Sequence, residues 1–222
     1  MIRRPPRSTR KESSAASDVY KRQDVVVELG NGDYIGYSNK ISEGKDETPK
    51  LPNNGLKKFF HHGYDPILGW IRKPNTSHSE QSENKITNWN INSQGYRVNL
   101  KHESLSNKIS CYGDSFTFCR QVNDDETWEY FLSKLSKINV QNFGVGNYGI
   151  DQSILRLEKN YSKNQTNIVI LAVVPDTICR IMSLWKHYYE YGNTFAFKPK
   201  FKLENGKLIL LPSSIQSGSD IL

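Results

Sequence analysis

The chain has 222 residues, of which 36% are hydrophobic and 24% are charged, and its formal net charge is +7 at pH 7. This length and composition predict one sizeable globular core with extra segments, and they exclude fibrous and low-complexity proteins. The longest apolar run, residues 168–174, is far too short to cross a bilayer as a helix, so we expect no membrane span in this chain.

The positive charge is concentrated at the N-terminus. Residues 1–23 contain seven arginine and lysine residues and two acidic residues, which leaves the rest of the chain near neutral. A near-neutral chain outside this segment lacks the basic surface that binds a phosphate backbone, and we therefore expect no nucleic-acid partner. The segment has no apolar signal-peptide region, and it resembles translated sequencing-adapter DNA. We predict that residues 1–23 are a disordered or artefactual leader, and the localisation stays open.

Residues 24–107 are rich in Asn, Ser, Gly and Lys, without a strong helical period. We predict an accessory segment of short strands and loops. Four aromatic side chains in this segment have the size to stack on a sugar ring, but packing is the favoured interpretation: Tyr64, Trp70, Trp89 and Tyr96. The three cysteines, Cys111, Cys119 and Cys179, lie in or beside apolar segments, which favours small buried side chains over a disulfide.

Residues 108–222 alternate between strand and helix patterns. Ile109–Tyr112 is an apolar run, and Asp125 is a candidate N-cap for the helix that follows it. The apolar residues of that helix recur at helical spacing: Trp128, Phe131, Leu132 and Leu135. This order predicts a strand, a loop and a helix.

The same order repeats further along the chain. Val140–Val145 is predicted as a second strand, and the next helix carries an apolar stripe of Ile150, Ile154, Leu157 and Tyr161. The uninterrupted run Ile168–Val174 is typical of a strand that is covered on both faces of a parallel sheet. The order βαβαβ predicts an α/β fold, a three-layer, doubly wound parallel sheet that is incomplete in this chain.

A hairpin is predicted near the C-terminus. The sequence FKLENGKLILL places alternating apolar residues on either side of Asn205-Gly206, which is a strong signal for a two-residue turn. We interpret this β-hairpin as a flap inserted into the predicted sheet domain.

Three loops follow the three predicted strands and carry the candidate chemistry. They are Gly113-Asp114-Ser115, Gly144–Gly149 and Pro175-Asp176. Because the carboxyl ends of parallel strands meet at one edge of a sheet, we expect these loops to lie together. A serine on a sharp turn there can present its hydroxyl to a ligand, so Ser115 is a candidate nucleophile. Asp114 is expected to hydrogen-bond the loop instead of acting as a base.

Three sequence blocks carry a family resemblance. The runs CYGDSFTFCRQVNDDETWEYFL, NFGVGNYGIDQSILRLE and IVILAVVPDTICRI resemble, in order, the first three blocks of the SGNH/GDSL hydrolase superfamily. The upstream runs YDPILGWIRKPN and INSQGYR are similar to a lead-in found in a bacterial branch of that family. The resemblance implies a serine esterase that acts on an O-acyl ester of a lipid, polysaccharide or cell-wall component, without cofactor or metal. Relatives often act outside the cytoplasm.

The resemblance also implies roles for single residues. Ser115 would be the nucleophile and, with Gly146 and Asn147, would form the oxyanion hole, while Gly113 and Asp114 would support the loop. None of the five histidines has an aspartate three residues before it, so the Asp-x-x-His block of the family is absent. We interpret the chain as truncated at its C-terminus and predict that these 222 residues alone are inactive.

Three alternatives stay open on the sequence. Pro175 stands where relatives often have an asparagine donor, which favours a non-catalytic binding or scaffold protein with the same fold. An O-acyltransferase would use the same serine. The run from Gly144 to Gly149 also matches G-x-G-x-x-G, the pattern of a dinucleotide-binding oxidoreductase, although the acidic residue that follows is farther away than that motif requires. The oligomeric state is not determined by the sequence.

Overall fold

The computed structural model describes residues 25–28, 34–37, 53–81, 85–186, 195–213, 215, 217 and 220. The chain divides into two compact units, Met1–Lys50 and Leu51–Leu222. In the first unit, β1 (Val25–Glu28) and β2 (Tyr34–Tyr37) form an antiparallel pair. The predicted leader, residues 1–23, lies outside the described residues.

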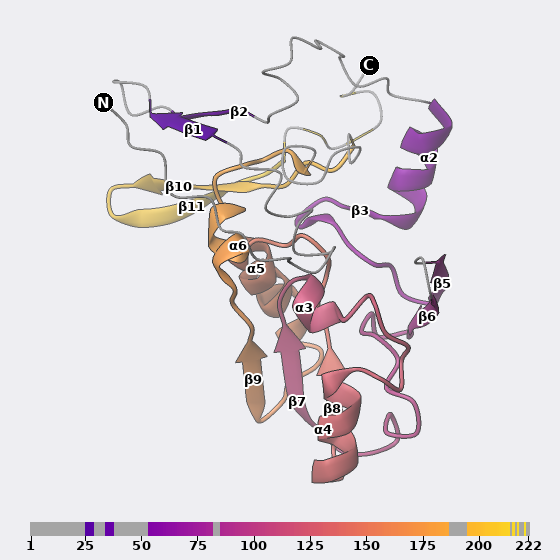
Figure 1. Cartoon of the computed structure of the whole chain (residues 1–222). Coiled ribbons are helices and arrows are strands. Elements are labelled where there is room, and N and C mark those ends of the chain that lie inside the picture. The colour runs from indigo at the N-terminus through magenta and orange to yellow at the C-terminus, as the bar shows by residue number, and fades with distance from the viewer. Residues whose placement is uncertain are drawn as a thin grey trace, which may run out of the picture. The chain divides into compact units, whose positions relative to one another are not determined.

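The segment that precedes the main sheet contains one helix and four short strands (Figure 1). These are α2 (Asn53–His62), β3 (Tyr64–Asp65), β4 (Gly69–Trp70), β5 (Thr76–Gln81) and β6 (Ile86–Ile91). The strands agree with the prediction, whereas α2 was not predicted. Its helical signal is weak because the helix has only ten residues and Gly55 lies in its first turn.

The aromatic side chains of this segment pack, as the sequence favoured. Trp70, Trp89 and Tyr96 are all buried, and Tyr64 packs against Phe59 and Phe60 of α2. The indole of Trp89 also lies against Phe118, with ring centroids 5.0 Å apart. Trp70, Trp89 and Tyr96 therefore join the accessory segment to the rest of the unit, whereas the ring of Tyr64 packs within the segment.

The centre of the second unit is a parallel three-stranded sheet in the order β8-β7-β9. It consists of β7 (Asn107–Tyr112), β8 (Asn139–Asn142) and β9 (Ile168–Leu171). β7 pairs in parallel with both neighbours, so the carboxyl ends of all three strands point the same way (Figure 1). The prediction of an α/β fold is confirmed at the level of a mixed α/β structure with one parallel sheet.

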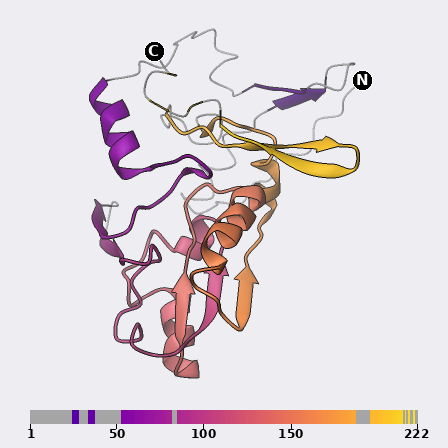
Figure 2. The same cartoon turned by 180° about the vertical axis from the view of Figure 1, so that it is seen from behind.

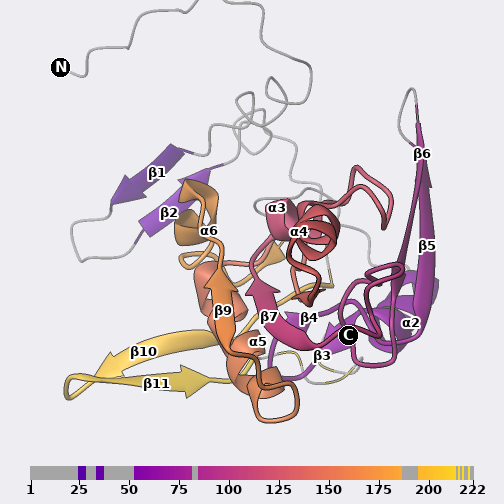
Figure 3. The same cartoon turned by 90° about the horizontal axis from the view of Figure 1, so that it is seen from below.

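Helices lie on both faces of this sheet. α4 (Trp128–Ser136) follows β7, and α5 (Ile150–Tyr161) follows β8. α5 lies behind the sheet in Figure 1 and in front of it in Figure 2, and the view from below separates α4 from α5 across the strands (Figure 3). Two short helices, α3 (Ser115–Phe118) and α6 (Pro175–Cys179), begin directly at the carboxyl edge.

The N-cap predicted for α4 is wrong. Thr127, not Asp125, precedes the helix in an extended conformation, and its side chain accepts a hydrogen bond from the backbone N–H of Tyr130. Asp125 lies two residues too early to reach the first free N–H groups of a helix that begins at Trp128.

Most of the predicted apolar stripe of α4 faces outward, although Leu132 packs against the core cluster of Ile109, Cys111 and Val140. Phe131 is 49% and Leu135 is 81% exposed, whereas Glu129 and Ser133 are buried. The sheet side of the helix is partly polar, since the Ser133 hydroxyl accepts hydrogen bonds from the Asn99 side chain (2.7 Å) and the Val140 backbone N–H (3.0 Å). Periodicity located the helix but not its buried face.

β9 is an edge strand and is not covered on both faces, which corrects the prediction for Ile168–Val174. The strand has four residues, and Ile168 is 52% exposed. Among the described residues its only strand neighbour is β7, which leaves the outer edge of β9 unpaired. An apolar run alone does not report whether a second strand or helix covers it.

The predicted hairpin is confirmed. β10 (Lys200–Glu204) and β11 (Lys207–Leu211) pair antiparallel in register around Asn205-Gly206. Both turn residues have positive φ angles, 50° and 75°, as a two-residue type I′ turn requires.

Candidate functional site at the carboxyl edge of the sheet

The loops after the three strands lie along one edge, as the sequence predicts. The backbone N–H of Val145 donates to the carbonyl of Gly113 at 3.0 Å, and the N–H of Ala172 donates to the carbonyl of Tyr112 at 2.9 Å. Gly144 packs so closely on α3 that an added Cβ would lie 2.5 Å from the backbone nitrogen of Phe118. The glycine therefore permits the loop after β8 to contact the loop after β7.

Ser115 is the first residue of α3 and is half-buried. Asp114 caps this short helix by accepting a hydrogen bond from the backbone N–H of Phe116 at 2.9 Å. The carboxylate of Asp114 thus holds the loop, which confirms that it hydrogen-bonds its own backbone. The chain leaves α3 at Cys119, whose left-handed φ of 57° ends the helix after one turn.

An ion pair joins the loop after β7 to the segment after α6. Arg180 donates from Nη1 to Oδ2 of Asp114 at 2.8 Å and to the carbonyl oxygen of Tyr148 at 3.2 Å. The Asp114 side chain is only 2% exposed. One guanidinium therefore connects the loops that follow β7, β8 and β9.

A second buried cation supports the same edge. Lys198 donates from Nζ to Oδ2 of Asp151 and to the carbonyl of Arg180, both at 2.6 Å. Burial lowers the pKa of Lys198, although the neighbouring Asp151 carboxylate raises it. The side chain is fully buried, so this contact links the segment after α6 to the start of α5.

Arg97 holds the chain that leaves α3. Its side chain is 1% exposed and donates to Oδ1 of Asp124 at 2.8 Å. The two terminal nitrogens donate to three backbone carbonyls, those of Phe118 (2.6 Å), Cys119 (2.7 Å) and Val122 (2.5 Å). Because a guanidinium has five donors in one plane, a single side chain fixes the whole turn after α3.

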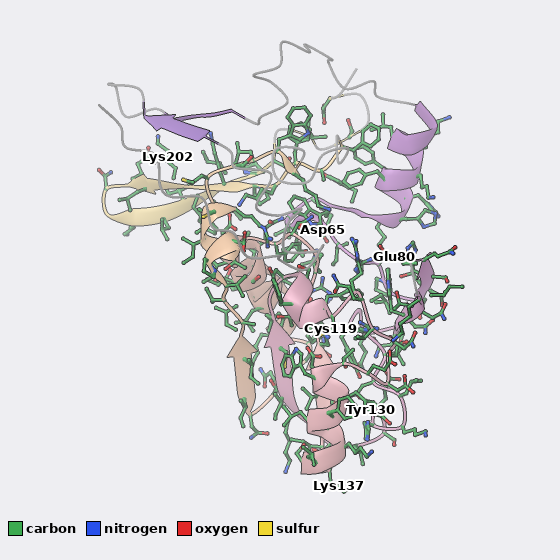
Figure 4. The ribbon with its side chains drawn as sticks, viewed as in Figure 1. Asp65, Glu80, Cys119, Tyr130, Lys137 and Lys202 are labelled. Atoms are coloured by element: carbon green, nitrogen blue, oxygen red, sulfur yellow. The ribbon has the colours of Figure 1, made fainter. Side chains whose placement is uncertain are left out.

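A pocket of about 300 Å³ opens beside this turn. Cys119, one of the lining residues, lies beside α3 in Figure 4. The lining residues all come from one continuous stretch of chain: Ser115, Phe116, Cys119, Gln121, Val122, Glu126 and Trp128. The pocket therefore has apolar and aromatic walls, with a hydroxyl, a thiol, an amide and a carboxylate among them.

The residues assigned to an oxyanion hole are placed differently. Gly146 and Asn147 do not line the pocket that contains Ser115. The carbonyl of Gly146 accepts a hydrogen bond from Nε1 of Trp70 at 3.1 Å, and Asn147 has a positive φ of 63°. Asparagine tolerates that conformation better than most residues, as the sequence suggested. Their assigned roles stay predictions.

Four of the five histidines are described, and each packs elsewhere. His61 contacts His62 in α2, and His78 stacks on Trp89. His102 packs against Tyr130 and lies 3.2 Å from the Asn99 side-chain oxygen. In the described part of the chain, no hydrogen bond joins Ser115 to a histidine. His187 lies outside the described residues.

The three cysteines differ in their surroundings. All are free thiols: Cys111 is buried, Cys119 is partly buried and Cys179 is exposed. The expectation of a small buried side chain holds for Cys111 alone. Burial raises the pKa of Cys119 to about 11, so the thiol beside the pocket stays protonated at neutral pH.

Across the described ranges, no group of three His, Cys, Asp or Glu side chains is arranged to hold a metal ion. The helices described here are all too short or too polar to cross a bilayer.

The sequence did not single out the charged residues that build this edge. Arg180, Lys198 and Asp151 are spread along the chain without a motif, and only their tertiary contacts bring them together. Arg97 ends the run INSQGYR, whose glycine and aromatic content stood out in the sequence. That run was the one available signal for the buried guanidinium.

Comparison with known proteins finds a weak similarity. No family model matches the chain. A protein named Potassium channel K1, from Plasmodium berghei (strain Anka), is 21% identical over 210 residues, which cover 82% of this chain. The chain spans about a tenth (11%) of the length of that relative.

This comparison contradicts the predicted function. The relative is named as a channel, not as a hydrolase, acyltransferase or oxidoreductase. The prediction of a serine esterase of the SGNH/GDSL type, together with its alternatives, is therefore withdrawn. The error has a physical reason: a Gly-Asp-Ser turn after a parallel strand describes a loop geometry, and that geometry serves many functions.

Proposed function

We propose that the second unit is a ligand-binding module whose site is the pocket at the start of α3. The observation that carries the proposal is the pocket itself, which opens at the carboxyl edge of a parallel sheet. Crevices at this edge are the usual ligand sites of such sheets. The turn that forms one wall is held by the buried Arg97, so the site exists before a ligand binds.

The lining selects a small, neutral ligand with an aromatic or aliphatic body. Phe116, Val122 and Trp128 supply the apolar surface, and Ser115 and Gln121 supply hydrogen-bonding groups. Such a mixture of apolar walls and a few polar atoms is typical of small-molecule sites.

Charge supports the choice of a neutral ligand. The Glu126 carboxylate accepts hydrogen bonds from Lys85 Nζ (2.7 Å) and from the Asn123 backbone N–H (2.8 Å), and these contacts lower its pKa. Since Glu126 is already paired with Lys85, it offers little attraction to a cationic ligand. The protonated Cys119 thiol is a poor nucleophile, which favours reversible binding.

The test is a titration of the ¹⁵N-labelled chain with neutral aromatic alcohols and amides, benzyl alcohol and benzamide. We expect chemical-shift changes at the backbone amides of Ser115, Gln121 and Trp128. Trp128→Ala should weaken binding about tenfold or more, since one large aromatic wall is lost. The matched control is Phe131→Ala, on the same helix but outside the pocket. Shifts that spread over the surface, or equal losses in both variants, would rule out this site.

We also infer that the sheet is the beginning of a doubly wound, three-layer fold. If the strands are numbered by their order in the chain, they lie across the sheet in the order 2-1-3. This is the order of the first three strands in flavodoxin-like sheets. The helices on opposite faces support the same inference (Figure 3). The resemblance to SGNH proteins stays a prediction about fold, and fold alone does not assign an activity.

A second candidate function is favoured by the channel relative. On that match, we propose that the chain belongs to a potassium-conducting protein. The test reconstitutes the chain in potassium-loaded vesicles and follows efflux with a potassium electrode. Selective efflux above that of empty vesicles would support conduction by this chain. Efflux equal to empty vesicles, with valinomycin as the positive control, would contradict conduction by this chain.

A further inference from the structure

The β10–β11 hairpin has two chemically different faces. Side chains alternate along each strand, and cross-strand partners share a face. Phe201 lies opposite Leu210, and Leu203 lies opposite Leu208. One face is therefore entirely apolar, and at its outer end Leu203 is 69% and Leu208 is 70% exposed.

The other face is basic. Its strand partners are Lys200 with Leu211, Lys202 with Ile209, and Glu204 with Lys207. The hairpin strands thus carry three lysines and one glutamate, and Lys202 pairs with Glu204 at 3.0 Å in an exposed contact. The lysine stems can extend past the strand edges while their ammonium groups stay in water.

The base of the hairpin packs against the core, and the side chains near its tip are exposed. Phe201 packs against the core cluster that contains Leu68, Trp70 and Tyr148. Beyond that residue the two strands project away from the sheet, as Figures 1 and 3 show. Lys202 lies on the projecting part, well away from Tyr130 of α4 and from Lys137, which follows that helix (Figure 4). The exposed leucines are therefore presented on a supported arm.

We propose that this hairpin docks the protein on an anionic lipid surface. The apolar face would enter the boundary between headgroups and acyl chains, and the lysines would contact the anionic headgroups. Among the described residues no strand pairs with the outer edges of β10 and β11, and backbone groups there must stay hydrated, so the hairpin lies at the interface and does not span the bilayer. This surface is separate from the pocket at α3.

Charge decides between a membrane and a second copy of the chain. A second hairpin packed on the apolar face would cover the leucines, but it would leave the net positive charge of three lysines and one glutamate on the opposite face without an anionic partner. An anionic lipid surface instead complements the three lysines. The exposed leucines find an apolar partner in either case, but only the anionic lipid surface also complements the net positive charge of the strands.

Vesicle flotation of the full chain tests the proposal. The vesicles contain phosphatidylcholine with about one quarter phosphatidylserine, or phosphatidylcholine alone, at about 0.1 M salt. Leu203→Asn with Leu208→Asn should lower the bound fraction about tenfold or more on the anionic vesicles. Lys200→Gln with Lys207→Gln should lower it about twentyfold, from roughly fivefold for each lysine.

Matched controls come from α4. Leu135→Asn removes a leucine that is 81% exposed, and Lys134→Gln with Lys137→Gln removes two exposed lysines. Neither change should alter binding more than about twofold, since α4 does not touch the lipid. These comparisons are needed because the basic residues of the 1–23 segment can bind anionic vesicles by charge alone in every variant.

Insertion gives a readout that charge alone does not produce. Leu208→Trp should add fluorescence that brominated acyl chains quench, whereas Leu135→Trp should add fluorescence that they do not quench. Equal quenching at both positions, or equal binding by the hairpin and α4 variants, would overturn the proposal. So would a dimer in light scattering that disappears when Leu203 and Leu208 are replaced, because a second copy would then be the partner.

Discussion

Arg180 reaches back across the carboxyl edge of the sheet, and its Nη1 atom lies 2.8 Å from Oδ2 of Asp114. The two residues are 66 positions apart in the chain, and their side chains are 13% and 2% exposed. We expect Arg180→Met to lower the free energy of unfolding by about 2 kcal/mol or more, because it leaves a buried carboxylate without its partner. Urea denaturation measures this change.

The control for that prediction is Lys202→Met. The Lys202 ion pair with Glu204 is largely exposed, and exposed pairs contribute about 0–1 kcal/mol. If Arg180→Met costs no more than Lys202→Met, the ion pair does not hold the loop. Adding Asp114→Asn to Arg180→Met should recover part of the loss, since the unpaired charge is then removed.

Arg97 should control the order of the turn that lines the pocket. Arg97→Lys keeps the positive charge but cannot reproduce the bonds to Phe118, Cys119 and Val122. We expect a loss of about 3 kcal/mol in stability, and faster hydrogen exchange confined to residues 118–124. Arg120→Lys, at an exposed pair with Glu80, is the matched control. Unchanged exchange in this turn would show that the buried guanidinium is dispensable.

Glu129 should make stability depend on pH. Burial raises its pKa to about 8, above the ordinary value of 4.5. The folded chain then holds a proton that the unfolded chain has lost between these two pH values. Stability from this group is complete below about pH 4.5 and is lost as the pH rises toward 8, with a slope of up to about 1.4 kcal/mol per pH unit.

Glu129→Gln tests this dependence because glutamine is neutral and has nearly the same shape. Urea midpoints at several pH values from 5 to 9 should fall more steeply for the wild-type chain than for the variant. The variant should be the more stable of the two at pH 8 to 9. Parallel pH profiles for both proteins would mean that Glu129 does not titrate in this range.

The turn of the hairpin offers a test of backbone conformation. Gly206 has a φ of 75°, and an added Cβ would meet nothing within 4 Å. Gly206→Ala should therefore cost about 1 kcal/mol through conformation alone. Gly146→Ala is the matched control, because an added Cβ at Gly146 would also meet nothing within 4 Å but the φ of Gly146 is not positive. This substitution should change stability little. Equal costs in thermal unfolding would contradict this explanation.

The chain by itself should not hydrolyse esters. No histidine contacts Ser115 among the described residues, and an unassisted serine hydroxyl is a weak nucleophile. We expect the hydrolysis of p-nitrophenyl acetate by the 222-residue chain to be the same in wild type and Ser115→Ala. A rate that falls a hundredfold in Ser115→Ala would contradict this expectation.

The sequence by itself determined the local elements. The order of strands and helices from Asn107 onward followed from periodicity, and Asn205-Gly206 predicted its hairpin, because both signals depend on residues close together in the chain. Asp114 could be assigned to its own loop for the same reason. The meeting of three loops at one edge followed from parallel topology.

Only the tertiary structure decided which surfaces are buried and which charges meet. Leu135 is exposed and Ser133 is buried, because the residues that face Ser133 are polar. The pattern of residues within a helix does not show which surface the helix will pack against. The contacts of Arg97 and Arg180 join segments that are distant in the chain. The pocket depends on those contacts, because long-range ion pairs hold its walls and a sequence carries no distance between residues far apart along it.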